Sequence, residues 1–109
     1  MDPIFLDFET EAIGPRPHEY PPKPVGLAVL DRTNQFQSGY FSFAHDSNNN
    51  TTFEAVHQML TDMWKSGRSV CFHNAMFDLA VIYEKFDLPF IEPERLHDTL
   101  VLAFLHDPY

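Results

Sequence analysis

Hydrophobic positions along the chain recur with the spacing of strands in some segments and of helices in others. The strand pattern covers residues 3–9, 25–30, 36–43, 69–72 and 95–97. Helical periodicity covers residues 51–65, 75–86 and about 98–105. The predicted order is β-β-β-α-β-α-β-α, in which a meander of strands precedes strand–helix–strand units. This order predicts an α/β fold with a mixed sheet, built as one domain over residues 1–109.

Proline and capping residues set the limits of these segments. Residues 11–24 contain five prolines, and we expect an irregular loop there. Thr51 and Glu54 have the spacing of a capping box and are expected to open the first helix. Asn74 is expected to N-cap the second helix, and Asp98 the third.

The charge of the chain restricts how it could bind nucleic acid. Its formal net charge is −9, with only seven Lys and Arg residues, and these form no cluster. Any contact with a polyanion must therefore be local, through metal ions, backbone N–H groups or stacking. No apolar run approaches the length of a membrane span. The single cysteine, Cys71, lies in an apolar run and is expected to be a buried thiol.

Asp7 and Glu9 are the first candidate site residues. Side chains alternate between the faces of a strand, so these two carboxylates point the same way. Mg²⁺ and Mn²⁺ take carboxylate oxygens as ligands, and a divalent cation between the two acids would offset their repulsion. The alternative is a strand end with solvated acids. For this pair alone, the two interpretations are equally weighted.

Asp78 is the third candidate. It lies one helical turn after Asn74, at the start of the helix that follows strand 69–72. A right-handed crossover would place that strand beside the first, so that Asp78 reaches the end of the sheet that carries Asp7 and Glu9. Alone, Asp78 reads as an ordinary acid near a helix N-terminus. Together with the other two acids, it favours a metal site.

The motifs around these acids resemble a known family. Asp7-Phe8-Glu9-Thr10 resembles the first motif of the DEDD (DnaQ-like) 3′→5′ exonucleases, and residues 74–78, with an Asn four residues before an Asp, resemble the second. Residues 97–100 and 104–108 are similar to the proofreading domain of family A DNA polymerases from bacteria and phages. The Pro-rich residues 21–26 resemble phage-type members. The resemblance covers nearly the whole chain.

The resemblance implies a ribonuclease H-like fold and a two-metal 3′→5′ exonuclease that removes nucleotides from the 3′ end of single-stranded DNA during proofreading. Asp7 and Glu9 would hold one Mg²⁺ or Mn²⁺ ion, Asp7 would bridge to a second, and Asp78 would help to hold that second ion. The ions would activate a water and stabilise the attacking and leaving oxygens. Thr10 and Asn74 would lie near the terminal nucleotide, and Asp98 would support the site. The expected location is the cytoplasm of a bacterium or phage-infected cell.

The chain departs from the family pattern at its third motif. That motif carries a fourth acid and a Tyr or His that orients the attacking water, and neither Asp98 nor Asp107 matches the acid. We therefore expect a C-terminally incomplete domain with weak or absent activity. Its expected partners are DNA and either a polymerase domain or a complementing C-terminal segment, with no membrane. The alternative is a catalytically inactive ribonuclease H-like remnant that binds nucleic acid or a partner.

Overall fold

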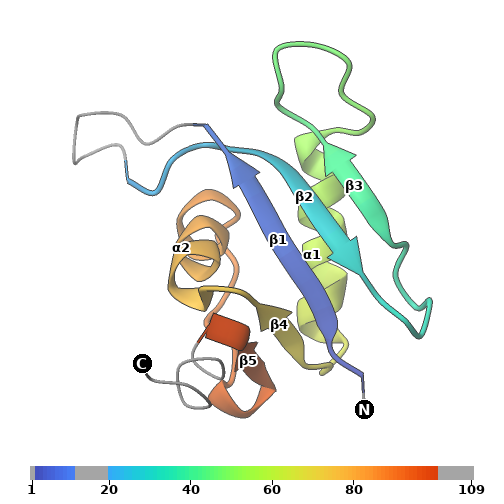
Figure 1. The fold of residues 1–109 in the computed structure, drawn as a ribbon, viewed down its shortest axis with the longest axis vertical. Helices are drawn as coiled ribbons and strands as arrows, with labels where there is room; N and C mark the ends of the chain where they lie inside the picture. The colour runs from blue at the N-terminus through green and yellow to red at the C-terminus, as the bar shows by residue number, and fades with distance from the viewer. Residues whose placement is uncertain (1, 12–19, 101–109) are drawn as a thin grey trace.

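A computed structural model describes residues 2–11 and 20–100 of the chain (Figure 1). Within these residues the order of elements matches the order expected from the sequence. The strands are β1 (Ile4–Thr10), β2 (Pro24–Leu30), β3 (Gly39–Ser42), β4 (Val70–Phe72) and β5 (Leu96–Asp98). The helices are α1 (Phe53–Lys65) and α2 (Ala75–Lys85), and a short 3-10 turn, η2 (Pro93–Arg95), precedes β5.

The five strands form one mixed sheet in the order β3-β2-β1-β4-β5. β1 pairs antiparallel with β2 and parallel with β4, and β4 in turn pairs parallel with β5. β2 and β3 form the expected antiparallel hairpin. β1 therefore lies at the centre of the sheet, where the meander meets the strand–helix–strand units. The expectation of an α/β fold with a mixed sheet is confirmed.

The core lies between one face of the sheet and the two helices. Alternate residues of β1 and β2 are buried against apolar residues of α1 and α2, which join them in one cluster. Figure 1 looks onto the other face of the sheet, with α1 behind the strands. This second face has an open hollow of about 260 Å³. The hollow is lined by Phe5, Leu6, Asp7, Ala28, Val29, Leu30, Cys71, Phe72, His73 and Thr99.

Several predicted boundaries of helices and strands are wrong by a few residues. The expected capping box on Thr51 is absent, because Thr52 is the N-cap and its hydroxyl accepts a hydrogen bond from the N–H of Ala55 at 3.1 Å. β5 begins at Leu96, since Arg95 belongs to the preceding 3-10 turn. The expected third strand over residues 36–43 shortens to Gly39–Ser42.

Two further expectations concern the ends of the described segments. β2 begins at Pro24, which was expected to lie in the loop; proline is tolerated as the first residue of a strand. The rest of the Pro-rich loop falls largely at residues 12–19, outside the described residues. Asp98 N-caps a helical turn at Thr99 and Leu100 as expected, and the predicted continuation to residue 105 also lies outside them.

A buried ion pair joins the turn after β2 to the start of β4. Nη1 and Nη2 of Arg68 donate to the two carboxylate oxygens of Asp31, at 2.6 and 2.9 Å. The side chains are 8% and 0% exposed. The guanidinium holds the pKa of Asp31 well below its usual range, because its hydrogen bonds outweigh the effect of burial. Asp31 also accepts hydrogen bonds from Thr33 and Phe36, which is why Phe36 lies in the turn rather than in β3.

We predict that Arg68→Met destabilises the fold by about 3–5 kcal/mol, because it leaves the Asp31 carboxylate buried without its cation. Urea unfolding measures this loss. Arg32→Met is the matched control, since the ion pair of Arg32 with Asp2 is 60% and 48% exposed. The control should lose less than about 1 kcal/mol. Equal losses in the two variants would contradict a structural role for the buried pair.

Candidate functional site

Asp7 and Glu9 lie at the end of β1 that extends past its neighbour β4. The parallel ladder with β4 includes only Ile4 and Phe5 of β1, because β4 is three residues long. Leu6 and Phe8 are buried, whereas Asp7 and Glu9 are exposed, as the alternation of a strand requires. The side chains of both acids therefore project from the same face of β1, beside the part of the strand that does not pair with β4.

Asp78 lies in the first turn of α2, beside this stretch of β1. Its residue is 2% exposed, and within the described part of the chain its Oδ2 atom has no hydrogen-bond partner. Burial, followed by the negative charge of Asp7, raises its pKa from 3.8 to about 7. A backbone hydrogen bond from Phe8 lowers the pKa in part. These effects place the Asp78 carboxyl within electrostatic reach of Asp7.

Asp98 fixes the start of α2. Asn74 occupies the expected N-cap position, but its backbone is left-handed (φ 69°, ψ 69°) and its side chain makes no capping hydrogen bond. The carboxylate of Asp98 accepts instead, from the N–H groups of Asn74 at 3.0 Å and Ala75 at 2.9 Å. The prediction that the Asn74 side chain caps the helix is wrong. A full negative charge is the stronger acceptor at the positive end of a helix.

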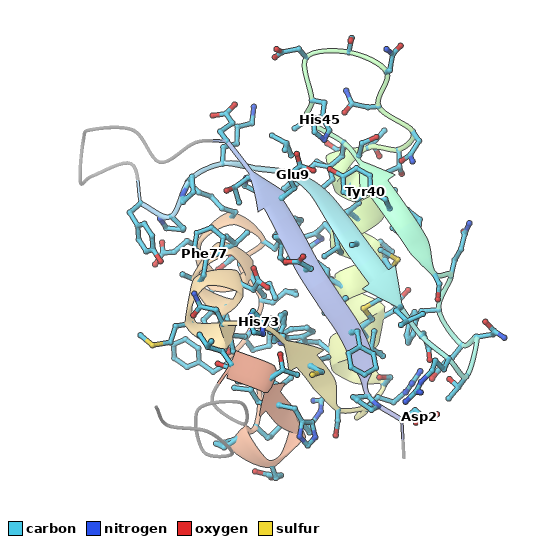
Figure 2. The ribbon with its side chains drawn as sticks, viewed as in Figure 1. Asp2, Glu9, Tyr40, His45, His73 and Phe77 are labelled. Atoms are coloured by element: carbon cyan, nitrogen blue, oxygen red, sulfur yellow. The ribbon has the colours of Figure 1, made fainter. Side chains whose placement is uncertain are left out.

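The Glu9 carboxylate is directed toward β3 rather than toward α2. Its Oε2 atom accepts a hydrogen bond from the Tyr40 hydroxyl at 2.6 Å, and that hydroxyl lies 2.7 Å from Nε2 of His45. Figure 2 shows these three side chains close together near the ends of β1 and β3. Burial and the bond to Glu9 raise the pKa of Tyr40 to about 12, so its hydroxyl stays protonated and remains a donor. Sequence reasoning missed Tyr40 and His45.

The fit of a divalent cation can be judged from these contacts. Among residues 2–11 and 20–100, no group of three or more His, Cys, Asp or Glu side chains is arranged to hold a metal ion. Asp7 and Asp78 nevertheless repel each other, and the buried Oδ2 of Asp78 has no hydrogen-bond partner in the same described segments. A cation with oxygen ligands would satisfy that oxygen and offset the repulsion. The pair fits such an ion, and Glu9 would join by rotating toward it.

Thr10 and Asn74 flank this arrangement. Thr10 ends β1, half-buried, after a bulge in its pairing with β2. Asn74 is exposed at the start of α2. Thr10 therefore lies at the same end of β1 as Asp7 and Glu9, and Asn74 lies one helical turn before Asp78. Asp107 lies outside the described residues.

Comparison with protein-family models finds no match, and comparison with characterised proteins finds none either. In the described part of the chain, no helix has the length and apolar character needed to cross a membrane. The structure shows an α/β fold with a mixed sheet. Of the three acidic residues, two lie on β1 and one lies on α2.

We predict that stability falls as the pH rises from 3.8 to about 7, because burial raises the pKa of Asp78. The folded chain keeps the proton up to about pH 7 and the unfolded chain releases it near its ordinary pKa of 3.8, so the folded state loses stability between these values. One pKa unit corresponds to about 1.4 kcal/mol, so the full loss is at most roughly 4 kcal/mol. Asp78→Asn should remove this loss and be the more stable protein above pH 7.

Urea unfolding at several pH values, in the presence of a chelator, measures the effect. Glu84→Gln is the matched control, because it removes one exposed carboxylate from the same helix. The control should keep the pH dependence of the parent chain. Identical pH profiles for the parent and Asp78→Asn would show that the Asp78 carboxyl is not strained by burial. Adding Mn²⁺ above pH 7 should stabilise the parent and leave Asp78→Asn nearly unchanged.

Proposed function

We propose that this chain is a DEDD-type 3′→5′ exonuclease domain with a ribonuclease H-like fold, which removes nucleotides from DNA 3′ ends. One observation carries the proposal: the Asp78 carboxyl is buried within electrostatic reach of Asp7, and one of its oxygens has no hydrogen-bond partner among residues 2–11 and 20–100. Burying an acid in this way destabilises the fold, so it calls for a compensating role. Strained acids of this kind are characteristic of metal and catalytic sites.

The sheet order adds support to the ribonuclease H-like assignment. A central β1 lies between an antiparallel meander and a parallel β4, and the helix after β4 brings an acid back to β1. The motifs Asp7-Phe8-Glu9-Thr10 and Asn74 to Asp78 lie on the strand and helix that the family resemblance requires. The fold alone does not determine the activity, which rests on the site.

Asp7, Glu9 and Asp78 would hold two Mg²⁺ or Mn²⁺ ions. When bound, the ions supply an activated water and stabilise charge on the attacking and leaving oxygens of the phosphodiester. The protein contributes the fixed position of Asp78, held through the capped start of α2, and the exposed position of Asp7 at the end of β1. Asp98 acts behind the site, through the backbone of α2.

The substrate would be the 3′ end of single-stranded DNA. With a net charge of −9, the chain offers no bulk attraction to DNA. Arg68 and Arg95 are already engaged, since both donate hydrogen bonds to groups of the protein itself. Binding would therefore depend on the metal ions and on local contacts, with Thr10 and Asn74 near the terminal nucleotide.

The proposed context is a family A DNA polymerase or a phage exonuclease, in the cytoplasm of a bacterium or of a phage-infected cell. The partner would be a polymerase domain or a complementing C-terminal segment that supplies the fourth acid and the water-orienting group. The second face of the sheet, which neither described helix covers, offers apolar surface for such a segment, since Leu30 and Tyr40 are 48% and 41% exposed there.

A second candidate is an inactive ribonuclease H-like remnant that binds nucleic acid or a partner. The orientation of Glu9 favours it, because the carboxylate is hydrogen-bonded to Tyr40 rather than grouped with the other two acids. In this case the fold would persist while the metal site has lost its function. The two candidates differ in whether Mn²⁺ binding leads to cleavage.

We predict that the chain, incubated with Mn²⁺ and a 5′-labelled single strand, shortens the strand slowly, one nucleotide at a time from its 3′ end, because it acts without the fourth acid and the water-orienting group. Asp7→Ala should reduce the rate by about 100-fold or more, because it removes a ligand of both ions. Gel electrophoresis of the labelled products measures both. Asp62→Ala, which removes an exposed carboxylate from α1, is the control and should match the parent.

The outcomes separate the candidates. Cleavage that persists in Asp7→Ala would remove the proposed mechanism, because the activity would then come from elsewhere. A parent chain that binds Mn²⁺ but leaves the strand intact would favour the inactive remnant.

A further inference from the structure

We propose that Tyr20 and Phe77 form an aromatic platform on which a nucleobase of the single-stranded substrate stacks, beside the acidic residues. The inference rests on the proposed function, to which it adds a binding site for a base of the strand. It starts from one ring contact between two segments that are far apart in the sequence. The rings of Tyr20, shortly before β2, and Phe77, on α2, meet edge to face, with centroids 6.3 Å apart and an angle of 67° between their planes.

The aromatic platform lies next to the candidate site because of how its two residues are held. Phe77 directly precedes Asp78 in the first turn of α2 (Figure 2). The segment that begins at Tyr20 is tied to the end of β1, where the N–H of Glu11 donates to the carbonyl of Lys23 at 2.9 Å. One ring therefore adjoins the buried acid, and the other comes from a segment bound to the strand that carries the two exposed acids.

The two rings differ in how much surface they leave free. Phe77 is half-buried and packs against the hydrophobic core, so its ring is a fixed support. Tyr20 is 52% exposed, although it touches that support. A tyrosine that only held its segment to α2 would gain most by burying its ring fully. The exposed surface of Tyr20 is therefore available to a flat ligand.

A nucleobase is the ligand that fits the charge of this chain. With a net charge of −9, the protein cannot collect a polyanion by bulk attraction, so a strand must be held by local contacts. Stacking on an aromatic ring is such a contact, and it accepts every base because every base has a flat π surface. The stacked base would belong to a nucleotide near the 3′ end, since the rings adjoin the acids that would hold the metal ions.

Lys23 adds a positive charge to the same short segment. It is exposed, and among the residues that the structure describes it forms no ion pair. Three arginines, by contrast, are each paired with an acid: Arg32, Arg68 and Arg95. Proteins that bind single strands combine aromatic rings for the bases with basic groups for the backbone. Residues 20–23 thus offer both kinds of contact beside the end of β1.

The test measures binding of a short 5′-fluorescein-labelled DNA strand by fluorescence anisotropy, in the presence of Mn²⁺. Phosphorothioate linkages near its 3′ end slow any cleavage. A second strand of equal length lacks the bases of its last few nucleotides. Tyr20→Ala removes the ring, whereas Tyr20→Phe keeps it. Phe90→Ala is the control, because it removes a ring that is 82% exposed and lies beyond the opposite end of α2.

We expect Tyr20→Ala to bind the complete strand about 5–100-fold more weakly than the parent, which is the usual effect of losing one stacked base. Tyr20→Phe and Phe90→Ala should bind it like the parent. On the strand without terminal bases, the parent should already bind weakly, and Tyr20→Ala should have no further effect. A merely structural role of the ring would lower the affinity for both strands.

The contribution of Lys23 is measured by the salt dependence of binding. Lys23→Gln should reduce the slope of log affinity against log salt concentration by about 0.7, because one phosphate contact is lost. Lys65→Gln, which removes an exposed charge from the last turn of α1, is the control and should keep the slope of the parent.

The possible failures are distinguishable. If the parent binds the strand and Tyr20→Ala binds it equally well, the aromatic platform is overturned and the proposed function stands. An equal loss of affinity for the strands with and without terminal bases would overturn stacking in the same way. A parent chain that binds neither strand in the presence of Mn²⁺ would overturn this inference and the proposed function together.

Discussion

The placement of the candidate site depends on a single carboxylate that is not one of its proposed ligands. Asp98, at the end of β5, accepts hydrogen bonds from three backbone N–H groups, two at the start of α2 and one in the helical turn that follows β5. It therefore fixes α2 against the neighbouring strand. Asp78 lies in the first turn of α2. The hydrogen bonds to Asp98 and the packing of α2 in the core therefore offset the free-energy cost of burying Asp78 beside Asp7.

The two ends of the sheet differ in how fully their buried charged side chains are paired and hydrogen-bonded. At one end Asp31 and Arg68 are buried with all their partners in place, and this end holds the β2–β3 turn to the start of β4. At the other end Asp78 is buried near the like charge of Asp7, and one of its oxygens has no hydrogen-bond partner in the part of the chain that the structure describes. Proteins commonly violate local rules at functional sites and compensate elsewhere. Here the buried Asp31–Arg68 pair can offset the cost of burying Asp78 at the other end.

Much of the fold follows from local patterns, while the site follows only in part. The alternation in β1 and the periodicity of α1 are strong enough to determine the order of elements and the hairpin. The sequence could not show that Asp98 would replace the Asn74 side chain as a cap, because the two meet only after β4 and β5 pair. Tyr40 was missed for the same reason: its proximity to Glu9 depends on the register of two strand pairs and on Gly26 between them. Contacts across a sheet become visible only when that register is known.

The brevity of β4 has a consequence for how this architecture could vary. If β4 continued for two more residues, it would pair with the outer half of β1. Its backbone would then occupy the space in which the first turn of α2 lies. In this fold, a longer and more regular β4 would therefore exclude the present position of Asp78 beside Asp7. Lengthening that strand would give a more regular sheet in which Asp78 no longer lay beside Asp7.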